Sequence, residues 1–420
     1  MKEMDSIKLG RVASLIIVGL ALLMPLSFSA GQDAGKPAPA PVPVRVHVSE
    51  GTRFVDNLAL KDFELEENGT PQRLDALYLV QGQTIARKEE LKAGQPDVSR
   101  AFYLLFQAVE WDKRMAEAVD YLFSSVLKPG DAMTLVTPVK AYNLQKDALA
   151  TKSPETLSRS MQETLRSDIQ KGGVEYRDII RSLRRITNAI EGKNKTVSED
   201  DLGSDISTSD FGLEQQLDLY RNNLKRMESM RLVDENKLIA FAESLRKRPG
   251  QKIVHFFYER EYRPEMSPMT MQVLLSQYQD DPTIQANLMD LFTFYRREAT
   301  FSAERVRKAF ADAGIVFNFI FMDKKSQSVF GGSMREMSED IFPGFRDIAL
   351  ASGGLVEISK NPADSFKLAA TANSGYYLLF YTPTQAPAAG EFQAIRVKVV
   401  SPEAAGKGYA VTARLGYYAR

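Results

Sequence analysis

The stretch AFYLLFQ, residues 101–107, decides the fold. It is apolar or aromatic up to Gln107, which is the pattern of a strand buried on both faces of a sheet. Similar runs follow at residues 131–138 (DAMTLVTP), 252–258 (KIVHFFY) and 315–323 (IVFNFIFMD), with helical segments between them. Strands that alternate with helices predict βαβ units and a mostly parallel, doubly wound, Rossmann-like α/β sheet.

Residues 99–372 are the expected extent of this α/β domain, and two helical insertions are expected inside it. The first covers about residues 192–247, and the second covers about residues 264–300. Both carry apolar residues at helical spacing, and such stripes usually face a core, so we expect a helical lobe beside the sheet. Heptad-like pairing with a partner's helix is the alternative.

The segments on either side of this domain are patterned as strands. Residues 42–48 (VPVRVHV) alternate in strand period, and Asn68-Gly69 is a strong signal for a hairpin turn. Neither segment has enough strands to bury a core alone. We therefore expect residues 42–82 and 376–420 to pack together as a β-sandwich-like domain that flanks the α/β domain.

Residues 1–30 predict export from the cytoplasm. A cationic start precedes an apolar run of about 17 residues, and a cleavage site follows at Ala30. An uncleaved N-terminal membrane anchor is the alternative. Residues 31–41 are predicted to be a Pro/Ala linker. The expected location is the periplasm or the medium, with no membrane span after cleavage.

Composition argues against several classes of function. Lys+Arg and Asp+Glu both number 54, a balance that is not typical of a nucleic-acid binder. The chain has no cysteine, which rules out disulfides, cysteine–zinc sites and thiol catalysis. His255, one of two histidines, lies in a buried run where a core role is expected, and no G-x-S-x-G elbow is present. We therefore expect no enzyme and no cofactor, with a hydrolase as the remaining alternative.

Motifs along the chain carry a family resemblance. LKDFELEENG (60–69) and the closing segments YYLLFYTP, FQAIRVKVV and VTARLGYYA resemble the two ends of the von Willebrand factor A-related proteins of the acidobacterial type. RPGQKIVHFF resembles the entry to that family's fourth strand, and GGVEYRDII resembles one of its helix starts. The resemblance covers residues 42–420. It implies a von Willebrand factor A domain with a metal-ion-dependent adhesion site.

The adhesion site that the resemblance implies is degenerate. The family's D-x-S-x-S stretch, a threonine and a later aspartate give Mg²⁺ or Ca²⁺ the oxygen ligands that these ions prefer. The aligned positions in this chain are Gln107, Val109, Trp111, Val174 and Glu259. Valine and tryptophan offer no oxygen, so the resemblance implies that no metal binds there.

Charged residues on the same loops leave other possibilities open. One is an atypical metal site made of Glu110, Asp112, Glu259 and Glu261, although solvated loop acids are the simpler interpretation. Ligands of doubly wound sheets bind at the carboxyl ends of the strands, so this edge is also the expected protein-binding surface. Its expected contacts are Glu110, Trp111, Asp112, Arg260 and Arg263. Packing of Trp111 into the vacated metal site is the competing interpretation.

These features together predict a non-catalytic, extracytoplasmic protein-binding or scaffold protein. The runner-up is a structural or assembly component of the cell envelope, held by its N-terminal helix. The sequence does not name the protein partner.

Overall fold

The computed structural model describes residues 4–7, 40–91, 96–145, 147–191, 212–297, 301–326, 329, 332–384, 387–400 and 408–420. Most of the expected signal sequence and linker, and the polar stretch at residues 192–211, lie outside these ranges. The mixed α/β class is confirmed. No helix within the ranges is both long and apolar enough to cross a bilayer.

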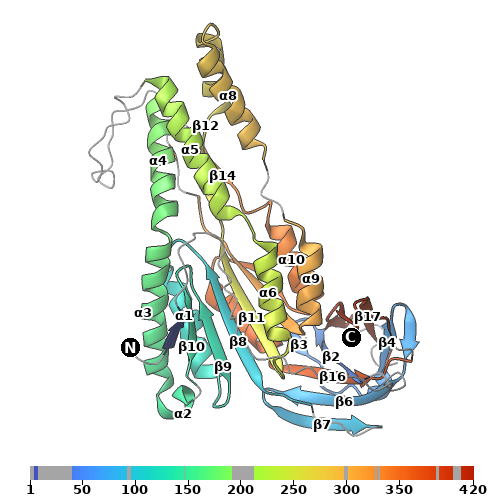
Figure 1. Ribbon diagram of the computed structural model, residues 1–420. Helices are drawn as coiled ribbons and strands as arrows, with labels where there is room; N and C mark the ends of the chain where they lie inside the picture. The colour runs from blue at the N-terminus through green and yellow to red at the C-terminus, as the bar shows by residue number, and fades with distance from the viewer. Residues whose placement is uncertain are drawn as a thin grey trace, which may run out of the picture.

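A seven-stranded sheet forms the centre of the molecule (Figure 1). In spatial order its strands are β1 (Met4–Ile7), β10 (Ala141–Leu144), β9 (Ala132–Val136), β8 (Arg100–Gln107), β11 (Gln251–Glu259), β13 (Ile315–Met322) and β15 (Val356–Ser359). The strands from β9 to β15 are parallel, whereas β10 is antiparallel to β9. The edge strand β1 pairs antiparallel with β10 and lies inside the expected signal sequence.

Helices cover both faces of this sheet. One face packs against α1 (Lys113–Tyr121), the π-helical turn η2 (Leu122–Val126), α3 (Pro154–Gly172) and α11 (Pro362–Ala372). The other face packs against α6 (Glu235–Arg246), α9 (Ala303–Asp312) and α10 (Phe342–Ala351). Successive residues of a strand point to opposite faces, so two covered faces require the mainly apolar runs of β8, β11 and β13. His255 in β11 and Asn318 in β13 are buried polar exceptions. The short α2 (Ala148–Thr151) lies between β10 and α3.

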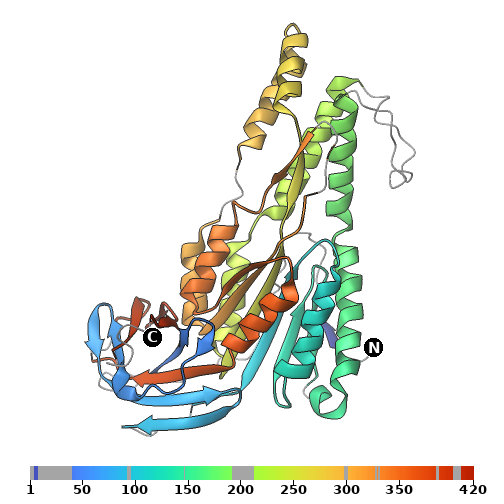
Figure 2. The ribbon, with the colours of Figure 1, turned by 180° about the vertical axis from the view of Figure 1, so that it is seen from behind.

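A helical arm projects beyond the carboxyl ends of the strands (Figures 1 and 2). It consists of α4 (Val174–Ile190), α5 (Leu213–Arg231), α7 (Pro268–Gln277), α8 (Pro282–Tyr295) and a ribbon of β12 (Tyr262–Met266) with β14 (Gly332–Glu336). The arm has its own apolar core, which includes Leu183, Tyr220 and Leu291. The expected end of the first insertion, at about residue 247, is wrong. The helix α6 covers one face of the central sheet instead of joining the arm, because Leu238 and Leu245 are buried against that sheet.

Strands from both flanking segments form a β unit of two sheets. The larger sheet contains β18 (Ala410–Ala413), β2 (Val42–Glu50), β16 (Gly375–Tyr381), β6 (Leu74–Gln81), β7 (Thr84–Glu90) and the short β3 (Arg53–Phe54). The smaller sheet contains β19 (Gly416–Tyr418), β17 (Phe392–Val399), β4 (Phe63–Glu67) and β5 (Thr70–Gln72), and the 3₁₀ turn η1 (Leu60–Asp62) precedes β4. Asn68 and Gly69 both have positive φ, as the two-residue turn between β4 and β5 requires. The N-terminal β segment extends past residue 82, because β7 pairs with β6.

Candidate functional site

The carboxyl ends of the parallel strands form the candidate site. The strand order reverses between β8 and β11, and ligands of doubly wound folds bind at such a switch point. The five positions aligned with the adhesion site all lie near strand ends or helix starts: Gln107 ends β8, Val109 and Trp111 follow it, Val174 begins α4, and Glu259 ends β11. Two of these residues are joined by a direct hydrogen bond.

Glu259 is fully engaged by its neighbours. Its Oε2 accepts hydrogen bonds from the backbone amides of Val109 at 2.7 Å and Glu110 at 3.1 Å, and its Oε1 accepts one from Lys324 Nζ at 2.6 Å. Burial raises the pKa of the Glu259 carboxyl, and the Lys324 ammonium and the Val109 amide oppose that effect. Both carboxylate oxygens therefore already have donors.

The Val109 segment is held from its other side by the start of α4. Arg177 donates to the carbonyl oxygen of Val109, and Gly173 lies so close that a Cβ there would collide with the same oxygen. The next residue, Val174, is 48% exposed. The structure thus brings Val109, Val174 and Glu259 to one edge, where neither valine side chain offers an oxygen.

Trp111 packs inward. It is partly buried against the apolar core beneath α1, which favours the packing interpretation, although part of its surface remains accessible. Asp112 caps α1 by accepting a hydrogen bond from the Arg114 amide at 2.9 Å. It also pairs with the Arg114 guanidinium at 2.5 Å.

The expected role of Arg263 as a surface contact is wrong. Its side chain is 2% exposed, pairs with Glu265, and lies over the rings of Phe294 and Tyr295 inside the arm. The reason is that the chain continues from β11 into the arm as β12 instead of turning along the edge. Arg260 stays at the edge, where it is paired with Asp323 at 3.0 Å and Glu336 at 2.7 Å.

The four loop carboxylates are paired with three different cations: Asp112 with Arg114, Glu261 with Arg231, and both Glu110 and Glu259 with Lys324. Glu261 is buried and lies 2.7 Å from Arg231 Nε, and Arg231 also pairs with Asp340 at 2.8 Å. Glu110 lies 3.8 Å from Lys324 Nζ, at the margin of an ion pair. Across the described ranges, no group of three or more His, Cys, Asp or Glu residues is placed to hold a metal ion.

His255 is a core residue. It is completely buried, its ring meets Phe366 edge-on at 4.8 Å, and no described residue hydrogen-bonds to either ring nitrogen. Burial lowers the pKa of the imidazole to about 3. The ring is therefore neutral at physiological pH, and it is not arranged as a base for a nucleophile.

Two of the residues that organise this edge have no clear sequence signal. Lys324 follows β13, and Arg231 ends α5, but their carboxylate partners come from distant segments. A lysine just after a buried strand was the only hint for Lys324.

Comparisons with protein-family models, with curated proteins and with solved structures find no match to this chain.

Proposed function

We propose that the chain is a von Willebrand factor A-related, non-catalytic protein that binds a protein partner or acts as a scaffold outside the cytoplasm. The strand order supports the relationship. From β10 to β15 the strands run 3-2-1-4-5-6 in chain order, the arrangement of doubly wound folds with a ligand site at the switch point. The motifs that carry the resemblance at both ends of the chain supply strands of the β unit.

The ion pair between Glu259 and Lys324 carries this proposal. The backbone amides of Val109 and Glu110 donate hydrogen bonds to the carboxylate of Glu259. Amide N–H groups are donors and cannot ligate a cation, so this side of the carboxylate is not open to a metal ion. The Lys324 ammonium then supplies the positive charge that a divalent ion supplies in an intact adhesion site. A partner of this protein is accordingly bound by surface contacts and not through a shared metal ion.

The arm offers such a contact surface. Met269 and Val273 lie one helical turn apart on α7 and are 77% and 55% exposed, and Met289 on α8 is 57% exposed. The arm extends well away from the rest of the molecule (Figure 1). Neighbouring exposed apolar side chains are typical of protein contact sites.

Capture from an envelope extract of the source organism tests the binding proposal. The bait is the full chain, compared with a Met269→Ser/Val273→Ser variant and with Leu350→Ser as the matched control. Leu350 is 56% exposed but lies on α10, away from the arm. We expect the arm variant to lose the captured protein at an unchanged melting temperature, while the control retains it. Equal capture by the wild-type chain, the arm variant and the control would show that these arm residues do not bind the captured protein.

Fractionation separates the proposal from its runner-up. Export with cleavage predicts a soluble protein whose first residue is Gly31, measured by mass spectrometry of the intact chain. An unprocessed chain in the membrane fraction would favour the anchored envelope component.

A further inference from the structure

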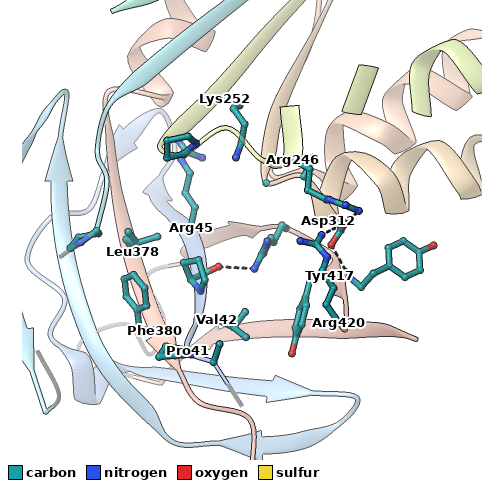
Figure 3. A pocket seen from close by; sticks show the side chains of 18 of the residues that line it. Pro41, Val42, Arg45, Arg246, Lys252, Asp312, Leu378, Phe380, Tyr417 and Arg420 are labelled. Atoms are coloured by element: carbon teal, nitrogen blue, oxygen red, sulfur yellow. Dashed lines mark hydrogen bonds and ion pairs between the residues drawn. The ribbon is translucent and has the colours of Figure 1, made fainter. Parts of the chain in front are cut away.

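A large pocket lies where the β unit meets the base of the α/β domain (Figure 3). Its volume is about 1130 Å³, slightly above the range of most small-molecule sites. Its walls come from β2 and β16 on one side, from the amino ends of β11 and β13 on another, and from the last residues of the chain. The strand β11 separates it from the edge at Glu259 by about 25 Å, so the two sites are distinct.

The pocket is strongly cationic. Its described lining holds six cations, namely Arg45, Arg246, Arg248, Lys252, Arg414 and Arg420. Two carboxylates accompany them. Asp312 pairs with Arg420 at 2.9 Å and with Arg246 at 3.8 Å, while Asp97 accepts a hydrogen bond from the Ser99 amide at 2.8 Å. The single negative charge of Asp312 is thus shared between two arginines, and the six cations exceed the two carboxylates by four.

The four cations that do not pair with Asp312 hydrogen-bond only to uncharged groups among the described residues, although the charge of Asp97 acts on Lys252 and that of Asp312 acts on Arg414. Arg45 donates to the Asn373 side chain at 3.0 Å and lies over the Tyr376 ring. The other three cations each donate a hydrogen bond to a neutral oxygen. Arg248 donates to the Tyr103 hydroxyl at 2.8 Å and Lys252 donates to the Arg248 carbonyl at 3.0 Å. Arg414 donates to the Pro43 carbonyl at 2.7 Å. Such an excess of positive charge in a partly enclosed space favours an anionic ligand.

Two of these cations converge at Gly314. A Cβ placed on that glycine would lie 3.8 Å from Lys252 Nζ and 3.9 Å from Arg414 Nη1, so one small group beside Gly314 reaches both side chains. Lys252 is only 7% exposed. Burial, followed by the nearby charges of Arg414 and Arg248, lowers the pKa of its ammonium to about 8. The charge of Asp97 opposes this effect only in part, and the ammonium donates its hydrogen bond to a carbonyl oxygen. Such a buried ammonium is costly to keep, and a bound anion would offset that cost.

The opposite wall of the pocket is apolar. Figure 3 shows Val42, Leu378 and Phe380 away from Lys252 and Arg246. Tyr376 and Tyr417 add aromatic surface, with Arg45 over the ring of the first and Arg414 over the ring of the second. The lining therefore presents a charged region and an apolar region to the same ligand.

We propose that this pocket binds an amphipathic organic anion. The carboxylate or phosphate group of the ligand lies among Lys252, Arg414 and Arg45, and its apolar body packs against Val42, Leu378 and Phe380. This proposal is independent of the protein-binding function at the sheet edge and the arm.

Titration calorimetry on the full chain tests the pocket with four probes. Laurate combines a carboxylate with an apolar chain, dodecyl phosphate changes the head group, inorganic phosphate lacks the apolar chain, and dodecyltrimethylammonium reverses the charge. We expect both amphipathic anions to bind, phosphate to bind at least tenfold more weakly, and the cation to show no saturable binding. Equal binding of the cation, or no binding of either anion, would overturn the proposal. If phosphate binds as tightly as laurate, the apolar wall has no role and the amphipathic assignment is wrong.

Four variants locate the binding. Lys252→Met and Arg414→Met remove one charge each, and Lys247→Met removes an exposed lysine that follows α6 and does not line the pocket. We expect laurate affinity to fall at least tenfold in the first two variants and to stay unchanged in the third. Arg414→Lys keeps the charge and should retain most of the affinity, which guards against misfolding of Arg414→Met. Unchanged laurate affinity in folded Lys252→Met would contradict the proposed site.

Discussion

The Lys324 ammonium lies 2.6 Å from the Glu259 carboxylate, and the side chain of Glu259 is only 8% exposed. The same carboxylate accepts two backbone amides from the loop after β8. One ion pair therefore ties the ends of β8, β11 and β13 together at the switch point of the sheet. Removing one partner of such a pair strongly destabilises a protein when the other partner is buried, because the buried charge is then left without compensation.

Lys324→Met is expected to destabilise the protein by about 2–4 kcal/mol at pH 7, measured by urea unfolding. Lys360→Met is the matched control, because Lys360 is 63% exposed and lies 3.9 Å from Asp323 at the same edge. Its effect should remain within about 0.5 kcal/mol. In the double variant Lys324→Met/Glu259→Gln, the loss should be smaller than in Lys324→Met alone, since no buried charge is left. Additive losses in the double variant would show that the two residues are not coupled.

Metal binding at this edge is expected to be absent. Wild-type protein should bind Mg²⁺, Mn²⁺ or Ca²⁺ no better than Glu259→Ala, because Val109, Trp111 and Val174 provide no oxygen ligands and Glu259 is already engaged. Calorimetric titration with each ion measures this. A micromolar affinity that Glu259→Ala abolishes would mean that the ion displaces Lys324 from the carboxylate.

Trp111→Ala should lower stability by about 2–3 kcal/mol, because the indole packs against the core beneath α1. Trp111→Phe, which keeps an aromatic ring, should recover about half of that loss. Melting temperature and partner capture are measured together on each variant. Lost capture at an unchanged melting temperature would assign Trp111 to the interface instead of the core.

The strands of the α/β domain are predictable from sequence for a simple reason. The apolar runs at residues 101–107, 252–258 and 315–323 match β8, β11 and β13 to within one or two residues. Helices cover both faces of the sheet there, so nearly every position of these strands is buried and most of their residues are apolar. The sequence pattern of a short segment is enough to predict a strand when nearly all of its residues are buried.

The side chains of the candidate site are less predictable, because their partners are distant in sequence. Arg263 follows a strand end, where an exposed charge is expected, but it is buried under Phe294 and Tyr295 from α8. No sequence pattern around residue 263 indicates that contact. The same holds for the basic pocket, where Arg45, Lys252 and Arg414 come from three separate parts of the chain.

Arg231→Met is expected to weaken the attachment of the arm to the sheet. Arg231 ends α5, is 3% exposed, and pairs with Glu261 at 2.7 Å and Asp340 at 2.8 Å. Its loss leaves two carboxylates in a buried environment, which should cost about 3–5 kcal/mol. Limited proteolysis should then cut within the arm before it cuts the sheet. Arg226→Met is the control, because Arg226 lies on the same helix, is 58% exposed and pairs with Glu175 at the surface. Equal proteolysis of both variants would show that the buried pair does not anchor the arm.

Lys252 should make the stability of the protein depend on pH in a direction opposite to that of an ordinary ion-paired lysine. Burial first, and then the charges of Arg414 and Arg248, lower its pKa from 10.5 to about 8, and Asp97 only partly opposes them. Below pH 8 the folded protein carries an unfavourable ammonium. Between pH 8 and 10.5 the unfolded chain binds this proton more tightly than the folded one, so the penalty decreases as pH rises.

Lys252→Met should therefore be more stable than wild type at pH 7, by at most about 3.5 kcal/mol, because each pKa unit corresponds to about 1.4 kcal/mol. That advantage should shrink steadily above pH 8 and disappear near pH 10.5. Taking the difference between the two proteins by urea unfolding at each pH cancels the titration of their tyrosines. Lys247→Met should show no such trend, since that lysine is exposed. A stability difference that is independent of pH would mean that the gain comes from the apolar methionine side chain and not from removal of a buried charge.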